Sequence, residues 1–153
     1  MPKHLTPGEV EEILCYTYQV LEVLRLNHYD ISVSDTPAGS DEFASMQLTQ
    51  GRFFGSLRVA EDWSKKTEYE KCGTIIHECL HLAHAHVNSA LAAVVGNSSA
   101  ISDELGTMID AVFMDAMEYM VDSLTVVIQE AYDLPWPTKA QVRKFMARYT
   151  AIS

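Results

Sequence analysis

The sequence is poor in cysteine. Its 153 residues include only Cys15, Cys72 and Cys79, and no two of them are spaced as Cys-x-x-Cys. A small odd number of thiols argues against a disulfide framework, and the spacing makes a cysteine-based zinc finger improbable. These features favour a protein of the reducing cytoplasm.

Long apolar runs are also missing. No stretch of about 20 apolar residues is present, which excludes a membrane-spanning helix, so no membrane partner is expected. The first residues, Met1-Pro2-Lys3-His4, lead into a mixed polar segment rather than the apolar centre of a secretory signal. We therefore expect no such signal in this sequence.

Positive charge is scarce as well. The sequence has 11 Lys and Arg residues and 21 Asp and Glu residues, which gives a formal net charge of −10 spread along the chain. Such a field repels phosphate backbones, so no nucleic-acid partner is expected. The length and the hydrophobic share of 48% are ordinary for a globular protein and predict a single domain over residues 1–153.

The first half of the chain predicts one helix and a small sheet. Thr6, Pro7 and Glu9 form a capping box with proline at the first helical position, and apolar residues at helical spacing continue to about Asn27. Three segments then read as strands, with at least one antiparallel pair. They cover residues 29–34, 43–49 and 52–59, with a loop at 35–41 and a turn at Gln50-Gly51.

The second half predicts two long helices and a short one, which makes the fold class α+β. Thr67 and Glu70 form a second capping box, and the helix they open ends at residues 96–99. Its expected buried stripe is Cys72, Ile75, Ile76, Cys79, Leu80 and Ala83. The next helix begins at Ser102-Asp103, and its stripe is Ile109, Val112, Phe113, Met117, Met120, Val121, Leu124 and Ile128. Residues 135–137 end it, and Thr138 caps a last helix to about Tyr149.

The first long helix carries His77-Glu78-Cys79-Leu80-His81. Histidines four residues apart project from one helix face about one turn apart, so both imidazoles can reach one tetrahedral Zn²⁺. Glu78 is then placed to act on a zinc-bound water without being a ligand itself. The motif predicts a zinc site with His77 and His81 as ligands and Glu78 as the catalytic base.

A catalytic zinc site needs a third protein ligand and one open position. His84 lies on nearly the same helix face as His81, but three ligands from one straight helix are sterically awkward. His86 is rotated off that face, and the position ten residues after His77 is Val87 rather than a histidine. Glu118, on the next long helix, is the best candidate.

Glu118 is followed at i+4 by Asp122, and this pair resembles the Glu-x-x-x-Asp arrangement of gluzincins. The resemblance implies that Glu118 binds zinc and that Asp122 supports a ligand histidine from outside the ligand shell. A solvated acidic stripe that includes Asp115, or a histidine as third ligand, stays open. Together these residues and the order of elements resemble the small single-domain zincins of phages and bacterial mobile elements.

Other families share part of the motif. A bacterial rRNA-processing endonuclease family has His-x-x-x-His, but it needs a third histidine at the position of Val87 and has glycine where Glu78 stands. Peptide deformylase has the whole motif, but its Glu-Gly-Cys-Leu-Ser-like segment is missing here. A non-catalytic zincin relative, which keeps the metal for stability or for binding a partner, is the main alternative to an enzyme.

The zincin resemblance implies a zinc-dependent peptide hydrolase that acts on a peptide or protein. In such a site the zinc activates a water and polarises the scissile carbonyl, while Glu78 takes the proton of that water and passes it to the leaving amine. The substrate is expected to add to the sheet as an extended strand, beside residues 43–49 or 52–59.

Overall fold

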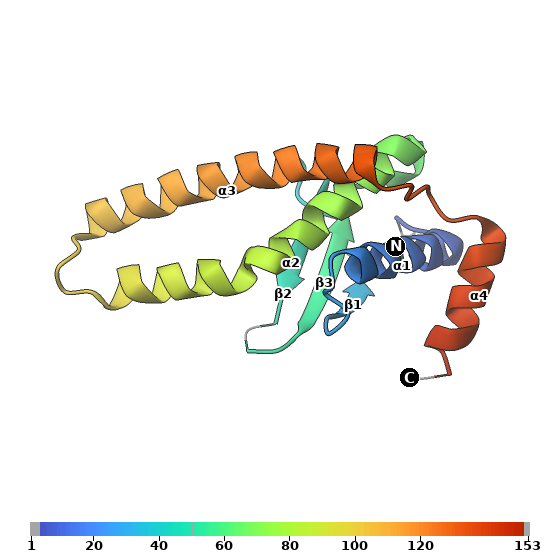
Figure 1. Cartoon of the computed structure of the whole chain (residues 1–153), viewed down its shortest axis with the longest axis horizontal. Coiled ribbons are helices and arrows are strands. Elements are labelled where there is room, and N and C mark those ends of the chain that lie inside the picture. Colours follow the sequence, from blue (N-terminus) through green and yellow to red (C-terminus); the bar gives the residue numbers. More distant parts are fainter. Residues whose placement is uncertain (1–3, 50, 152–153) are drawn as a thin grey trace.

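The computed structural model describes residues 4–49 and 51–151 as an α+β fold (Figure 1). One helix, a three-stranded sheet, two long helices and a short helix follow one another, as the sequence predicts. A single 3-10 turn, which was not predicted, precedes the first long helix. The elements are α1 (Pro7–Val23), β1 (Asp30–Val33), β2 (Ala44–Leu48), β3 (Phe54–Val59), η1 (Trp63–Lys65), α2 (Glu68–Asn97), α3 (Asp103–Ala131) and α4 (Lys139–Tyr149).

Capping boxes fix the starts of α1 and α2, as predicted. The Glu9 N–H donates to the Thr6 hydroxyl over 3.3 Å, and the Thr6 N–H donates to the Glu9 carboxylate over 2.8 Å. The same pair of bonds joins Thr67 and Glu70, over 3.2 and 2.7 Å. These bonds satisfy N–H groups that have no partner inside the helix.

Helix α1 ends four residues before the predicted limit near Asn27. Arg25 adopts a left-handed conformation with φ of 59°, and the Leu26 N–H donates back to the Leu21 carbonyl over 2.8 Å. This is the bond pattern of a Schellman helix end, which usually has glycine at the left-handed position. Because Arg25 stands there instead, the sequence carries no signal for the earlier end.

The sheet has the strand order β1-β3-β2. β1 is parallel to β3 and β2 is antiparallel to it, which confirms the predicted antiparallel pair. In the predicted turn between β2 and β3, Gly51 has φ of 73°, while Gln50 lies outside the described residues. The substrate was expected to add as a strand beside residues 43–49 or 52–59. Because β3 is the central strand and has no free edge, the second of these segments cannot accept an added strand.

β2 keeps a free edge, and its hydrogen bonds show which groups lie there. The Thr49 N–H donates to the Phe54 carbonyl and the Ala60 N–H to the Phe43 carbonyl, both over 2.9 Å. Since bonding alternates along an antiparallel strand, the odd-numbered residues of β2 bond to β3. The main-chain groups of Ala44, Met46 and Leu48 therefore point to the outer edge.

One core joins the sheet to the helices. α1 packs on β1 and α2, α2 packs on β2, and α4 covers α1. The most deeply buried large side chains are Ile13, Tyr16, Leu21, Ile31, Leu57, Trp63, Ile75 and Ile76. All three cysteines are buried free thiols. This agrees with the prediction, from their small odd number, that the protein has no disulfide framework. Within the described ranges, no helix combines the length and apolarity needed to cross a bilayer.

Helices α2 and α3 form an antiparallel hairpin whose distal part extends well beyond the sheet and α1 (Figure 1). This shape overturns part of the predicted burial. Ala83, Val112 and Leu124 are exposed, whereas Leu82 and Thr125 are buried in the inner half of the hairpin. Val112 lies on the distal part of α3, which nothing in the described chain covers, whereas Ala83 and Leu124 each lie one residue away from the position that is buried.

Candidate metal centre

His77 and His81 lie on consecutive turns of α2 with their side chains converging. Their Nε2 atoms are 3.0 Å apart, and the ring centroids are 4.8 Å apart with the planes inclined at 71°. The buried residues Cys72, Ile75, Ile76 and Cys79 fix the rotation of the helix, so both histidines sit at the edge of the core. The spacing of four residues therefore brings both ring nitrogens to one point, as predicted.

Glu118 on α3 completes a group of three. Its Oε2 atom lies 3.4 Å from His77 Nε2, and its Oε1 atom lies 3.4 Å from His81 Nε2. Met117 and Val121 are buried and turn this face of α3 toward α2. Within the described residues, His77, His81 and Glu118 are the group of side chains whose donor atoms could hold a metal ion together.

The spacing of the donor atoms fits a tetrahedral ion. Zinc bonds of about 2.0–2.2 Å place two donors of a tetrahedron about 3.4 Å apart. The two Nε2 atoms are 3.0 Å apart, and each lies 3.4 Å from one of the two Glu118 carboxylate oxygens, so each separation is close to that value. Two imidazoles and one carboxylate are also a donor set of catalytic zinc sites, in which the fourth position is open. The residues present therefore fit zinc.

Two features favour the form of the imidazole rings that can bind a cation. Burial lowers the pKa of His81, which favours the neutral ring that binds metals, although the Glu118 carboxylate opposes this effect. Asp122 Oδ1 lies 3.1 Å from His77 Nδ1, the nitrogen that faces away from the group. A carboxylate there holds the proton on Nδ1 and leaves the Nε2 lone pair free.

Glu78 lies beside the group and is only 7% exposed. Burial raises the pKa of its carboxyl to about 7; a hydrogen bond from the Met46 backbone opposes the shift, and the Glu118 and Glu42 carboxylates add to it. Met46 belongs to β2, and its main-chain groups lie on the outer edge of that strand. Glu78 is thus held between the free edge of β2 and the three donor residues.

A cavity of about 430 Å³ opens next to this arrangement. His77, Glu78, Glu118 and Asp122 line one side of it, and Asp41, Glu42, Phe43 and Ala44 line the other. Sequence reasoning assigned residues 35–41 to a loop and gave them no part in the site. No local signal marks them, since only the folding of β2 against α2 brings the loop to the metal helix.

The other residues considered as ligands lie elsewhere. His84 is outside the group of three, and its buried Nε2 atom has no hydrogen-bond partner. His86 contacts the Phe53 ring, 5.8 Å between centroids, at a separate cavity. Val87 is exposed on the hairpin. Tyr69 and Tyr119, which could have stabilised an oxyanion, are exposed and do not line the metal-side cavity.

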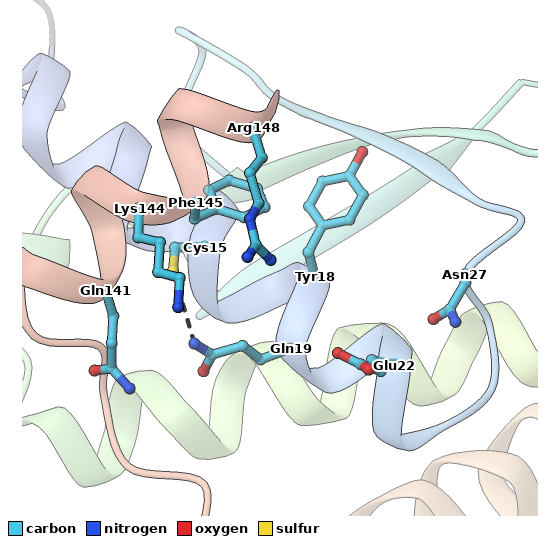
Figure 2. Close-up of a pocket in the computed structure, with 9 residues that line it drawn as sticks. All are labelled: Cys15, Tyr18, Gln19, Glu22, Asn27, Gln141, Lys144, Phe145 and Arg148. Atoms are coloured by element: carbon cyan, nitrogen blue, oxygen red, sulfur yellow. Dashed lines mark hydrogen bonds between the residues drawn. The ribbon is translucent and has the colours of Figure 1, made fainter. Parts of the chain in front are cut away.

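A second cavity of similar size lies between α1 and α4, where side chains of both helices surround it (Figure 2). Lys144 and Arg148 come from α4, and Tyr18 and Gln19 come from α1. Its lining contains one carboxylate, Glu22, and no histidine. It therefore lacks the set of donors found beside α3.

The chain matches no protein-family model, no curated protein and no solved structure. The interpretation of the centre consequently depends on its own geometry.

Proposed function

We propose that the protein is a zinc-dependent peptide hydrolase of the gluzincin type, with His77, His81 and Glu118 as ligands. The observation that carries the proposal is the cluster of one donor atom each from His77, His81 and Glu118, all within 4.8 Å of one another, beside a buried carboxylate and a cavity. The chemistry supplied by a zinc ion in this cluster is Lewis acidity, which polarises a scissile carbonyl and acidifies a water molecule.

Glu78 acts as the general base. Its carboxylate faces the cavity that the donor residues line, so it can accept a proton from the attacking water and deliver it to the leaving amine. Hydrolysis then balances, because the water supplies a hydroxyl to the acyl carbon and a proton to the amine. The Met46 backbone holds the carboxylate in position.

The substrate adds to the outer edge of β2. This edge carries the unpaired main-chain groups of Ala44 and Leu48, and Phe43 and Ala44 line the cavity. An extended peptide on this edge would gain main-chain hydrogen bonds and pass next to Glu78. This supports a peptide or protein substrate over a small molecule.

A non-catalytic metal protein is the alternative, and Glu78 weighs against it. Burying a carboxylate is unfavourable, and here burial raises its pKa. A purely structural metal site would gain nothing from this carboxyl group. An apolar side chain at the same position could be buried with a lower free-energy cost.

The test is a Glu78→Gln variant. It should retain about one zinc per chain and the wild-type circular dichroism spectrum, while turnover of a quenched fluorescent peptide library falls by at least about 100-fold. Glu68→Gln, an exposed carboxylate of the same helix, is the matched control and should leave turnover unchanged. Wild-type turnover in Glu78→Gln would refute the proposed base, and a zinc-loaded wild type without turnover would favour the non-catalytic alternative.

A further inference from the structure

The distal part of α2 and the loop that follows it are exposed and yet carry no charged side chain, whereas the distal part of α3 carries Asp103, Glu104, Asp110 and Asp115. Between Glu78 and Asp103 the sequence contains no Asp, Glu, Lys or Arg, although 21% of the whole chain is charged. Most residues from 83 to 97 are exposed, and the hairpin projects away from the body of the protein (Figure 1). Solvent-facing helix surfaces normally carry charged side chains, so this composition indicates that something covers the hairpin.

The two helices contact each other along an inner seam. On α2 it consists of His84, Asn88, Leu91 and Val95, which are half-buried. On α3 it consists of Gly106, Ile109, Phe113 and Met117, which are buried or half-buried. A Cβ atom on Gly106 would lie 3.0 Å from Val95 Cγ1, so the helices approach closely at the distal end. The inner seam uses one face of each helix, which on α2 includes the polar side chains of His84 and Asn88.

A second apolar row, the outer seam, lies one residue before each position of the inner seam. On α2 it is Ala83, Val87, Ala90 and Val94, and on α3 it is Leu105, Met108, Val112 and Ala116. All eight residues are exposed. Their spacings of three and four residues are those of packed helices in bundles.

The outer seams of the two helices lie on the same side of the hairpin. One residue corresponds to a rotation of about 100° around a helix. Because α2 and α3 run antiparallel, a backward step of one residue from the inner seam turns both helices toward the same side. The corresponding forward step leads to Ala85, Ser89, Ala92 and Gly96 on α2 and to Thr107, Asp110, Met114 and Glu118 on α3, so the opposite side has smaller side chains on α2 and is more polar on α3.

We propose that two copies of the chain associate through their outer seams to form a symmetric dimer with a four-helix bundle. A twofold contact requires a surface that is complementary to itself, and two rows of apolar side chains meet that requirement. Pairs of antiparallel helices bury such rows against each other in four-helix bundles.

The size of the face suits this partner. At 1.5 Å per residue, the 12 residues from Leu105 to Ala116 span about 18 Å, and two helices of about 10 Å diameter make a face about 20 Å wide. This projection of about 360 Å² is a minimum, because side chains that stand on it expose a larger accessible area, and it suits an interface at or below the roughly 800 Å² per partner of a standard one.

Charge also favours this region for self-association. Two chains of net charge −10 repel each other, but the charged residues lie outside the segment from Cys79 to Ser102. The α2 half of the outer seam lies in this uncharged segment, and on α3 the seam positions themselves are uncharged, with the carboxylates of Glu104 and Asp115 at its margin. Since the remaining repulsion is screened over about 8 Å at physiological ionic strength, association should become tighter as salt is added.

The dimer leaves the metal centre accessible. Glu118 follows the inner-seam residue Met117 by one position, on the side opposite to the outer seam. Met108 lies ten residues, or about 15 Å along the helix axis, before Glu118. The inference is therefore independent of the proposed hydrolase function.

The test uses sedimentation velocity with two matched substitutions. Wild type should sediment with twice the 17.1 kDa mass of one chain, with a dissociation constant in the micromolar range or below. Met108→Lys places a charge in the outer seam of both partners and should weaken the dimer by at least about 100-fold. Met114→Lys places the same charge on the opposite side of α3 and should leave the dimer intact. Both variants should keep the wild-type circular dichroism spectrum.

Three results would overturn the proposal. A monomeric wild type at high concentration and high salt would exclude self-association. A dimer that Met108→Lys does not weaken, or that Met114→Lys weakens equally, would place the interface elsewhere. Binding of the monomer to neutral phosphatidylcholine vesicles, abolished by Met108→Lys, would assign the same face to a lipid surface.

Discussion

Asp122 Oδ1 lies 3.1 Å from His77 Nδ1, while the other nitrogen of the same ring faces His81 Nε2 across 3.0 Å. One imidazole thus connects a carboxylate at the rim of the cavity with the group of three donor residues. This arrangement gives two acidic residues of the same helix different positions relative to the group. Glu118 contacts the point where an ion would bind, whereas Asp122 can act only through the His77 ring.

The first prediction separates Glu118 from Asp122. Asp122→Ala should weaken zinc binding about 10–100-fold, the usual effect of removing a partner of a ligand histidine. Glu118→Ala should weaken it far more, because one of three protein donors is lost. Competition with a fluorescent chelator measures both. Asp115→Ala, an exposed carboxylate of the same helix, is the control and should bind zinc like wild type. Equal effects of Glu118→Ala and Asp115→Ala would reject Glu118 as a ligand.

The second prediction concerns the two histidines. Purified protein should carry close to one zinc per chain by mass spectrometry of the metal. His77→Ala and His81→Ala should each lose it, since two remaining donors hold zinc poorly. His86→Ala should keep full occupancy, because His86 lies against Phe53 rather than in the group. Stoichiometric zinc in a His77→Ala, His81→Ala double variant is incompatible with this centre.

The features that could be predicted from the sequence are those coded within a few residues. Thr67 and Glu70 cap α2 through bonds between positions three apart, and His77 and His81 meet because four residues make about one helical turn. The proximity of Glu118 to these histidines could not be predicted from local spacing alone. It followed from the resemblance of Glu118 and Asp122 to the gluzincin pair, and the structure brings Glu118 to that position.

The features that could not be predicted depend on contacts between distant segments. Nothing near Ile31 or Gly55 indicates that β1 pairs with β3 and skips β2. Periodicity also shows which face of a helix is apolar without showing what covers it. For this reason Val112 and Leu124 were expected in the core, although Val112 lies on the distal part of α3 and Leu124 is exposed beside the buried Val121 and Thr125.

The third prediction concerns the cysteines. Burial raises the pKa of the Cys15, Cys72 and Cys79 thiols, and the neighbouring Glu78 carboxylate adds to the effect at Cys79. A raised pKa keeps a thiol protonated at pH 8, and the thiolate is the reactive form. Native protein should therefore react with Ellman's reagent at least about 100-fold more slowly than protein in guanidinium chloride, which should release three equivalents per chain. Rapid labelling of one native thiol would contradict the burial of that residue.

The last prediction tests the packing beneath the free edge of β2. A Cβ atom on Gly55 would lie 2.8 Å from Ile31 Cδ1 and 3.1 Å from Met46 Sδ, and Ile31 is fully buried. Gly55→Ala should therefore lower the free energy of unfolding by about 1–3 kcal/mol, as overpacking of a core does. Ile31→Val alone removes the Cδ1 methyl group and should cost about 0.5–1.5 kcal/mol.

Combining the two substitutions distinguishes a clash from a general weakness of the strand. In the double variant the new Cβ occupies the space that Cδ1 leaves, so the total loss should be smaller than the sum of the single losses by at least about 0.5 kcal/mol. Urea denaturation measures all three variants. Gly8→Ala, where no atom lies within 4 Å of the added Cβ, is the control and should change stability by less than about 0.5 kcal/mol. Strictly additive losses would show that Gly55 is required for a reason other than its contact with Ile31.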